Sequence, residues 1–186
     1  MRLSEKIPAI PMAPAKKKLA LRPILAAGGI VLRGGRKPLI AVVQLRARKT
    51  WVLPKGKLHR NETLLAAAKR EAIEETGRDI AVYEYLGQIE YRSGGLPKVA
   101  KFWRMEAKGK QRKLLHEVRA VQWLPLAKAV SKLSRPRERK FLGQVGPRAV
   151  EAATRASKPA GLAYLHDCIR SFVGHLRRIW TNSSMR

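Results

Sequence analysis

Residues Gly56 to Arg78 read GKLHRNETLLAAAKREAIEETGR, and this stretch determines the fold expected of the whole chain. It concentrates carboxylates in a protein whose 40 lysines and arginines far outnumber its 13 aspartates and glutamates. The acidic residues of the stretch are Glu62, Glu71, Glu74 and Glu75. Such a local reversal of charge in a basic chain needs a physical cause.

The spacing of the glutamates predicts that three of them share one face of a helix. A helix from Thr63 to Thr76 turns about 100° per residue, so spacings of three and four place Glu71, Glu74 and Glu75 together. Like charges at these spacings destabilise a helix by about 0.2–0.5 kcal/mol per pair. A divalent cation would relieve this repulsion, and converging carboxylates are the ligands that Mg²⁺ or Mn²⁺ prefers. The pattern therefore predicts a metal site, against the alternative of a solvated acidic face.

The residues around these glutamates resemble the signature of the Nudix hydrolases. The matching positions, at the spacing of that signature, are Gly56, Glu62, Arg70, Glu71, Glu74, Glu75 and Gly77. The preceding segment WVLPKG, from Trp51 to Gly56, also looks like the family's approach to this motif. Ala72 and Arg78 depart from the pattern, because larger aliphatic residues are usual at both positions. Neither change removes a carboxylate, so we expect only the next strand to be affected, with burial beginning at Ile80.

This resemblance implies a fold of the α/β class, a Nudix-type α/β/α sandwich with a mixed sheet. It also implies metal-dependent hydrolysis of a pyrophosphate bond by attack of water at phosphorus. In such an enzyme Glu71, Glu74 and Glu75 would bind Mg²⁺ or Mn²⁺, the carbonyl of Gly56 would add a ligand, and Arg70 would orient the glutamates. Bound metal lowers the pKa of its water and screens the charge of the phosphate.

The resemblance suggests one further acidic group, outside the signature. In several Nudix enzymes a glutamate from the loop before the last strand is an extra metal ligand or the base, and Glu117 stands where such a residue could be. His116 beside it is a second candidate. The general base stays open among Glu71, Glu74 and Glu117, and Glu62 is expected to support the loop or a water of the outer shell.

Cations are dense in the segment RARKTWVLPKGKLHR that leads into the acidic helix. Hydrolysis of a pyrophosphate needs positive charge beside the metal, because negative charge develops on the transferred phosphoryl group. We therefore expect Arg46, Arg48 and Lys55 to contact substrate, with an exposed loop of solvated cations as the alternative.

The order of apolar and turn-forming residues predicts one domain with two appendages. Residues 1–20 form a basic, proline-containing N-terminal tail, residues 21–135 the Nudix hydrolase domain, and residues 136–186 a basic helical C-terminal extension. Within the domain we expect strands at 23–32, 38–45, 80–91, 99–105 and 119–123, and a short helix at 126–133. The first two strands are apolar almost throughout, which predicts burial on both faces of the sheet.

The C-terminal extension carries an apolar stripe at helical spacing. Its members are Leu162, Leu165, Ile169, Phe172, Val173, Leu176 and Trp180. Packing against the protein's own body, a dimer interface and a membrane-surface helix all stay open for this stripe.

The net charge of +27 favours polyanionic partners: a phosphate-rich small molecule, an anionic membrane, or nucleic acid bound by the basic tails. Cys168 is the only cysteine, which excludes an intramolecular disulfide and indicates a reducing, cytoplasmic location. No apolar run approaches the ~20 residues of a transmembrane helix.

The resemblance indicates the chemical class of the substrate and does not identify the compound. The LPKG-type segment resembles Nudix subfamilies that cleave dinucleoside polyphosphates such as diadenosine polyphosphates, or diphosphoinositol polyphosphates; another nucleoside diphosphate derivative is the general expectation. Two alternatives remain: an RNA-binding protein or RNA 5′-end pyrophosphohydrolase that uses its basic tails, and a non-catalytic Nudix-type binding or regulatory module.

Overall fold

The structure is a computed structural model that describes residues 22–114 and 117–157. The N-terminal tail, His116, Cys168 and the apolar stripe from Leu162 to Trp180 lie outside the described residues. The expectations of nucleic-acid binding through the tails and of an oligomer through the last helix fall there too. No helix of the described part is long and apolar enough to cross a membrane.

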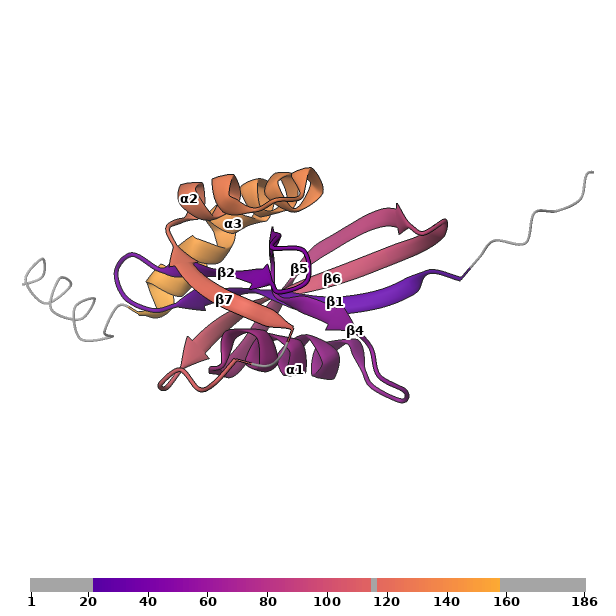
Figure 1. The fold of residues 1–186 in the computed structure, drawn as a ribbon. Coiled ribbons are helices and arrows are strands. Elements are labelled where there is room, and N and C mark those ends of the chain that lie inside the picture. The colour runs from indigo at the N-terminus through magenta and orange to yellow at the C-terminus, as the bar shows by residue number, and fades with distance from the viewer. Residues whose placement is uncertain (1–21, 115–116, 158–186) are drawn as a thin grey trace, which may run out of the picture.

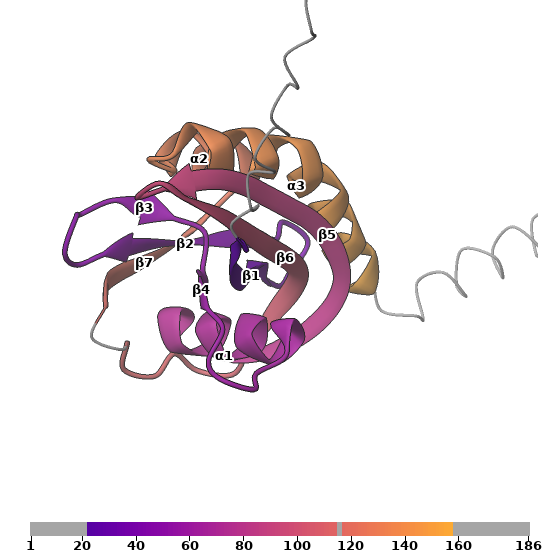
Figure 2. The same ribbon diagram turned by 90° about the vertical axis from the view of Figure 1, so that its right-hand side faces the viewer.

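The described chain forms a seven-stranded mixed sheet between helices (Figure 1). In chain order the elements are β1 (Ile24–Arg33), β2 (Leu39–Leu45), β3 (Trp51–Val52), β4 (Lys55–Lys57), α1 (Leu64–Thr76), β5 (Asp79–Ser93), β6 (Leu96–Lys108), β7 (Val118–Leu124), α2 (Leu126–Lys132) and α3 (Pro136–Ala156). In both views α1 lies on one side of the sheet, and α2 and α3 lie on the other (Figures 1 and 2). The predicted α/β/α sandwich is confirmed.

The centre of the sheet is the parallel pair of β1 and β6, in register from Ile24 with Lys98 to Arg33 with Ala107. All other pairings are antiparallel, so the sheet is mixed. β5 and β6 form a long ribbon that curves around the domain (Figure 2). The short strands β3 and β4 were not predicted, because two or three residues are too few to show an alternating pattern; they arise from pairing with β2 and β1.

Apolar side chains of β1 and β2 point to both faces of the sheet and build two cores. On the side of α2 and α3 the strands contribute Ile30, Leu32, Ile40 and Val42. On the side of α1 they contribute Ala27, Val31 and Ala41. All seven side chains are fully buried, as the continuous apolar sequences of these strands predict.

The helix α1 is fixed at both ends and packs through alanines. The hydroxyl of Thr63 accepts a hydrogen bond from the amide of Ala66 at 3.2 Å, and Gly77 adopts φ 67° and donates its amide to Ile73. These are the N-cap and the left-handed C′ residue that the sequence predicts. The buried face of α1 presents Ala67, Ala68 and Ala72 to the sheet. Small side chains let the helix axis lie close to β1, which accounts for alanine at position 72.

Burial of the strand after α1 begins only at Ile80, as the departure from the motif at Arg78 suggests. Asp79 is exposed and Ile80 is 6% exposed, so the inward-facing pattern of β5 begins at Ile80.

The helix α3 belongs to the same core as the sheet. Its apolar face contributes Phe141, Leu142, Ala149 and Ala153 to the core on the side of α2. The ring of Phe141 lies 5.0 Å from that of Phe102 on β6. The packed core therefore continues beyond residue 135, where the C-terminal extension was expected to begin, as far as Ala153.

Candidate active site

The guanidinium of Arg70 holds three of the four glutamates of the motif. Its Nε and Nη2 donate to the two carboxylate oxygens of Glu62 at 2.8 and 3.0 Å. Its Nη1 donates to Glu71 at 2.8 Å and to Glu74 at 3.1 Å, and Nη2 also donates to the carbonyl of Lys57 at 3.1 Å. Arg70 therefore orients the acidic cluster and ties it to the end of β4.

Glu62 ties the loop before α1 to this arginine. Its carboxylate accepts a hydrogen bond from the amide of His59 at 2.9 Å in addition to those from Arg70. The hydrogen bonds from Arg70 and then from His59 lower the pKa of Glu62 from 4.5 to about 2. The residue thus supports the loop, one of the two roles that the sequence left open.

We expect Glu62→Gln to weaken folding in a pH-dependent way. The pKa in the folded protein lies below the unfolded value of 4.5, so the stabilisation is present above that pH and is lost as the pH falls toward 2. The loss of unfolding free energy relative to the wild type, measured in urea, should shrink between about pH 6 and about pH 3. Glu90→Gln, which alters an exposed carboxylate, is the matched control. A loss that does not vary with pH would contradict this role.

Glu71 lies directly against the backbone of Gly56. A Cβ atom built on Gly56 would overlap the carboxylate of Glu71, so the absence of a side chain makes the space that the carboxylate fills. The position of Gly56 is fixed by the pairing of β4 with β1, where Gly56 lies opposite Ala27. Burial raises the pKa of Glu71, and the charges of Glu74 and Glu117 add to this, while Arg70 opposes it.

Glu75 is the most deeply buried carboxylate of the cluster, with 7% of its surface exposed. It accepts a hydrogen bond from the backbone amide of Lys55 at 2.9 Å. Burial, together with the charges of Glu71 and Glu117, raises the pKa of Glu75 from 4.5 to about 8, against the opposing charge and backbone hydrogen bond of Lys55. A buried acid that other acids surround is stabilised by a cation.

Glu117 joins the cluster from the other end of the domain sequence. It stands in the turn before β7, and its carbonyl accepts the amide hydrogen of Arg46 at 2.9 Å. Its charge is close enough to raise the pKa of both Glu71 and Glu75. The structure thus brings Glu117 toward Glu71 and Glu75.

The residues of the cluster suit a hard divalent cation in kind, although they are engaged with one another. Glu71, Glu75 and the backbone of Gly56 offer oxygen ligands, the donor set of Mg²⁺ and Mn²⁺. Among residues 22–114 and 117–157, no group of three or more Asp, Glu, His or Cys side chains is arranged to hold an ion as it stands. In this arrangement the guanidinium of Arg70 donates to one carboxylate oxygen of Glu71 and to one of Glu74.

A family model described as the NUDIX domain matches residues 22–145 of this chain. The chain belongs to the Nudix family. The match covers every element from β1 to the first half of α3, together with the acidic cluster.

The chain is similar to two curated mycobacterial Nudix relatives. It is 34% identical over 115 residues to the 8-oxo-(d)GTP phosphatase of Mycolicibacterium smegmatis, an alignment that covers 62% of this chain and 36% of that protein. It is 32% identical over 139 residues to the putative mutator protein MutT4 of Mycobacterium tuberculosis, covering 62% and 52%. The chain therefore spans only about a third to a half of the length of these relatives.

Solved Nudix structures share the fold. The binary complex of a C. elegans Ap4A hydrolase superimposes with a TM-score of 0.61 at 23% identity, covering 67% of this chain and 96% of that one. The MutT protein of Methanosarcina mazei Go1 gives a TM-score of 0.59 at 20% identity, covering 70% and 98%.

The three predicted substrate cations of this Nudix domain lie in different settings. Arg46 and Arg48 are in the exposed turn after β2, and Arg46 also donates to the carbonyl of Val118 at 3.4 Å. Lys55 instead directs its ammonium to the buried carboxylate of Glu138 on α3 at 3.0 Å, and its side chain is only 9% exposed. Sequence reasoning missed Glu138, although Pro136 and Glu138 together are typical of the first turn of a helix.

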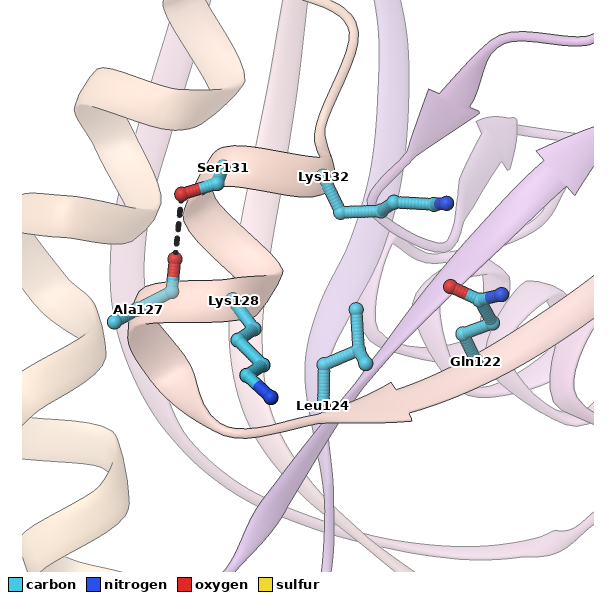
Figure 3. A pocket seen from close by; sticks show the side chains of 6 residues that line it. All are labelled: Gln122, Leu124, Ala127, Lys128, Ser131 and Lys132. Atoms are coloured by element: carbon cyan, nitrogen blue, oxygen red, sulfur yellow. Dashed lines mark hydrogen bonds between the residues drawn. The ribbon is translucent and has the colours of Figure 1, made fainter.

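A second feature of this Nudix domain is a depression of about 470 Å³ between β7 and α2 (Figure 3). It is lined by Gln122, Leu124, Ala127, Lys128, Ser131 and Lys132. The two lysines stand one helical turn apart, and no acidic residue is part of this lining. The ammonium of Lys132 lies 4.5 Å from the ring centre of Trp51, at the start of the segment that leads to Gly56. The depression therefore carries two cations, and one of them contacts Trp51 of β3.

Proposed function

We propose that this chain is a metal-dependent pyrophosphohydrolase whose active site is the acidic cluster of α1 together with Gly56 and Glu117. The observation that carries the proposal is Glu75, a buried carboxylate beside two further acids. Glu71, Glu74, Glu75 and the carbonyl of Gly56 would hold Mg²⁺ or Mn²⁺, which lowers the pKa of its water and screens the phosphate charge.

The residues of the chain have separate parts in this proposal. Arg70 would keep Glu71 and Glu74 in place through the hydrogen bonds described above, and the amide of Lys55 would orient Glu75. The proton of the attacking water passes to a member of the coupled group formed by Glu71, Glu74 and Glu117. Arg46 and Arg48, in the turn beside Glu117, would bind oxygens of phosphate groups away from the cleaved bond.

For the substrate we propose a nucleoside polyphosphate, with dinucleoside polyphosphates and 8-oxo-dGTP as the first compounds to test. The 8-oxo-(d)GTP phosphatase and the Ap4A hydrolase to which the chain is similar suggest these two compounds, and the surplus of cations suits a ligand with several phosphates.

A substrate panel with purified protein and Mg²⁺ tests the proposal. It compares nucleoside triphosphates, 8-oxo-dGTP, diadenosine polyphosphates, nucleotide sugars, diphosphoinositol polyphosphates and 5′-triphosphate RNA, with separation of the products. We expect metal-dependent cleavage of a pyrophosphate bond in at least one nucleoside polyphosphate. Absence of metal-dependent cleavage across the panel would instead support a binding or regulatory module.

The net charge of +27 favours RNA as a second candidate ligand. Phosphate contacts make such binding steeply dependent on salt. RNA affinity that does not fall between about 50 and about 200 mM salt would remove this candidate.

A further inference from the structure

The carboxylate of Glu138, at the start of α3, is 1% exposed and contacts the segment before Gly56. Its Oε2 accepts a hydrogen bond from the backbone amide of Leu53 at 2.9 Å. Its Oε1 pairs with the ammonium of Lys55 at 3.0 Å and with Arg135 at 3.3 Å. The Lys55 ammonium also donates to the carbonyl of Leu53 at 3.3 Å. One carboxylate therefore fixes both a main-chain group and a side chain of the same short segment.

Helix stability alone does not account for these contacts. A glutamate in the first turn of a helix is favourable near the helix N-terminus even when it is exposed. Burying the charge with that of Lys55 has a desolvation penalty, which the contacts must offset. The amide of Leu53 is separated from Glu138 by 85 residues of sequence, so the contact joins α3 to the loop between β3 and β4.

The same segment contacts the acidic cluster on its other side. The amide of Lys55 donates to Glu75, and the next residue, Gly56, lies against the carboxylate of Glu71. The carbonyl of Pro54 accepts the amide of Gly29 from β1 at 3.1 Å. Lys55 thus stands between two acids, with its amide on Glu75 and its ammonium on Glu138.

We propose that Glu138 is a positioning residue that sets the affinity of the active site for its divalent cation. Through Leu53 and Lys55 it fixes the path of the main chain up to Gly56. The Gly56 carbonyl and the amide that orients Glu75 are held in place by this path. The inference rests on the metal site proposed above, and it assigns to α3 a part in metal binding through main-chain geometry.

The test measures Mn²⁺ binding to the full chain without substrate, using electron paramagnetic resonance to detect the free ion. Glu138→Gln keeps an oxygen acceptor for Leu53 and removes the charge that holds Lys55. We expect Mn²⁺ affinity to fall by about ten- to a hundredfold, the range for residues that orient metal ligands. With the panel substrate, kcat should fall at fixed subsaturating metal and recover in part at high metal, while KM changes little. Glu151→Gln, which breaks an exposed pair with Arg155 on the same helix, should leave both quantities unchanged.

A second variant covers the outcome in which Glu138→Gln does not fold. Combining Lys55→Met with Glu138→Leu removes both charges together, a replacement that proteins often tolerate well. Circular dichroism and the thermal midpoint establish that each variant is folded. Weaker Mn²⁺ binding by folded Glu138→Gln, or by the double variant where Glu138→Gln does not fold, supports the proposal, and wild-type affinity in that variant overturns it. A wild-type protein that binds no Mn²⁺ would instead refute the proposed metal site itself.

Discussion

Replacing Glu75 by Gln is expected to lower turnover by at least about a hundredfold. Glutamine has nearly the same shape and still offers an oxygen to the amide of Lys55, so the main chain should keep its path. The charge that would attract the metal is lost, and disturbing even the residues around metal ligands has effects of about ten- to a hundredfold. Steady-state kinetics at saturating Mg²⁺ with the cleaved substrate measures the change. Near-normal turnover would contradict the assigned role.

Stability should move in the opposite direction to turnover in this variant. The pKa of Glu75 in the folded protein, about 8, lies above the unfolded value of 4.5. The wild type therefore loses stability as the pH rises between these two values, since folding then requires a buried negative charge or a bound proton. Without metal, Glu75→Gln should be at least as stable as the wild type at pH 8, as followed by urea denaturation. Glu90→Gln should change neither turnover nor this pH dependence.

Replacing Gly56 by Ala should also reduce turnover by about a hundredfold. The added methyl group would overlap the carboxylate of Glu71, and Gly56 cannot retreat because β4 is paired with β1. Glu71 must therefore move, and a displacement of about 1 Å at a reacting centre can lower a rate by about a hundredfold. Kinetics and Mn²⁺ affinity together report the effect.

The matched control for this substitution is Gly34→Ala. A Cβ on Gly34 meets no atom within 4 Å, so this variant adds the same methyl group where there is room. It should retain turnover and Mn²⁺ affinity. If Gly56→Ala kept wild-type values of both, the contact between Gly56 and Glu71 would have no bearing on the site.

Local signals made much of the fold predictable. The helix over residues 64–76 is bracketed by a capping threonine and a left-handed glycine, features that depend only on neighbouring residues. The buried strands β1 and β2 are predictable from their continuous apolar sequences. β3 and β4 could not be predicted, because their pairing depends on strands elsewhere in the chain rather than on their own two or three residues.

In the candidate site, too, local features could be predicted from the sequence and long-range contacts could not. The motif spacing places Glu71, Glu74 and Glu75 together, and the loop position of Glu117 suggests its approach. The partner of Lys55 could not be inferred, because Glu138 lies in a basic stretch of sequence and meets Lys55 only after α3 folds onto the sheet. A cation that looks available to substrate in the sequence is thus enclosed by the fold.

The alanine face of α1 has a consequence for how this protein can change. The side chains of Ala67, Ala68 and Ala72 set the distance between α1 and the sheet. The motif glutamates of α1 belong to the same helix, so they move when the helix moves. A larger residue at position 72 would lift the helix and carry its carboxylates away from Gly56. Mutations on this inner face, which contacts the sheet and no ligand, should therefore weaken binding of the proposed divalent cation before they unfold the protein.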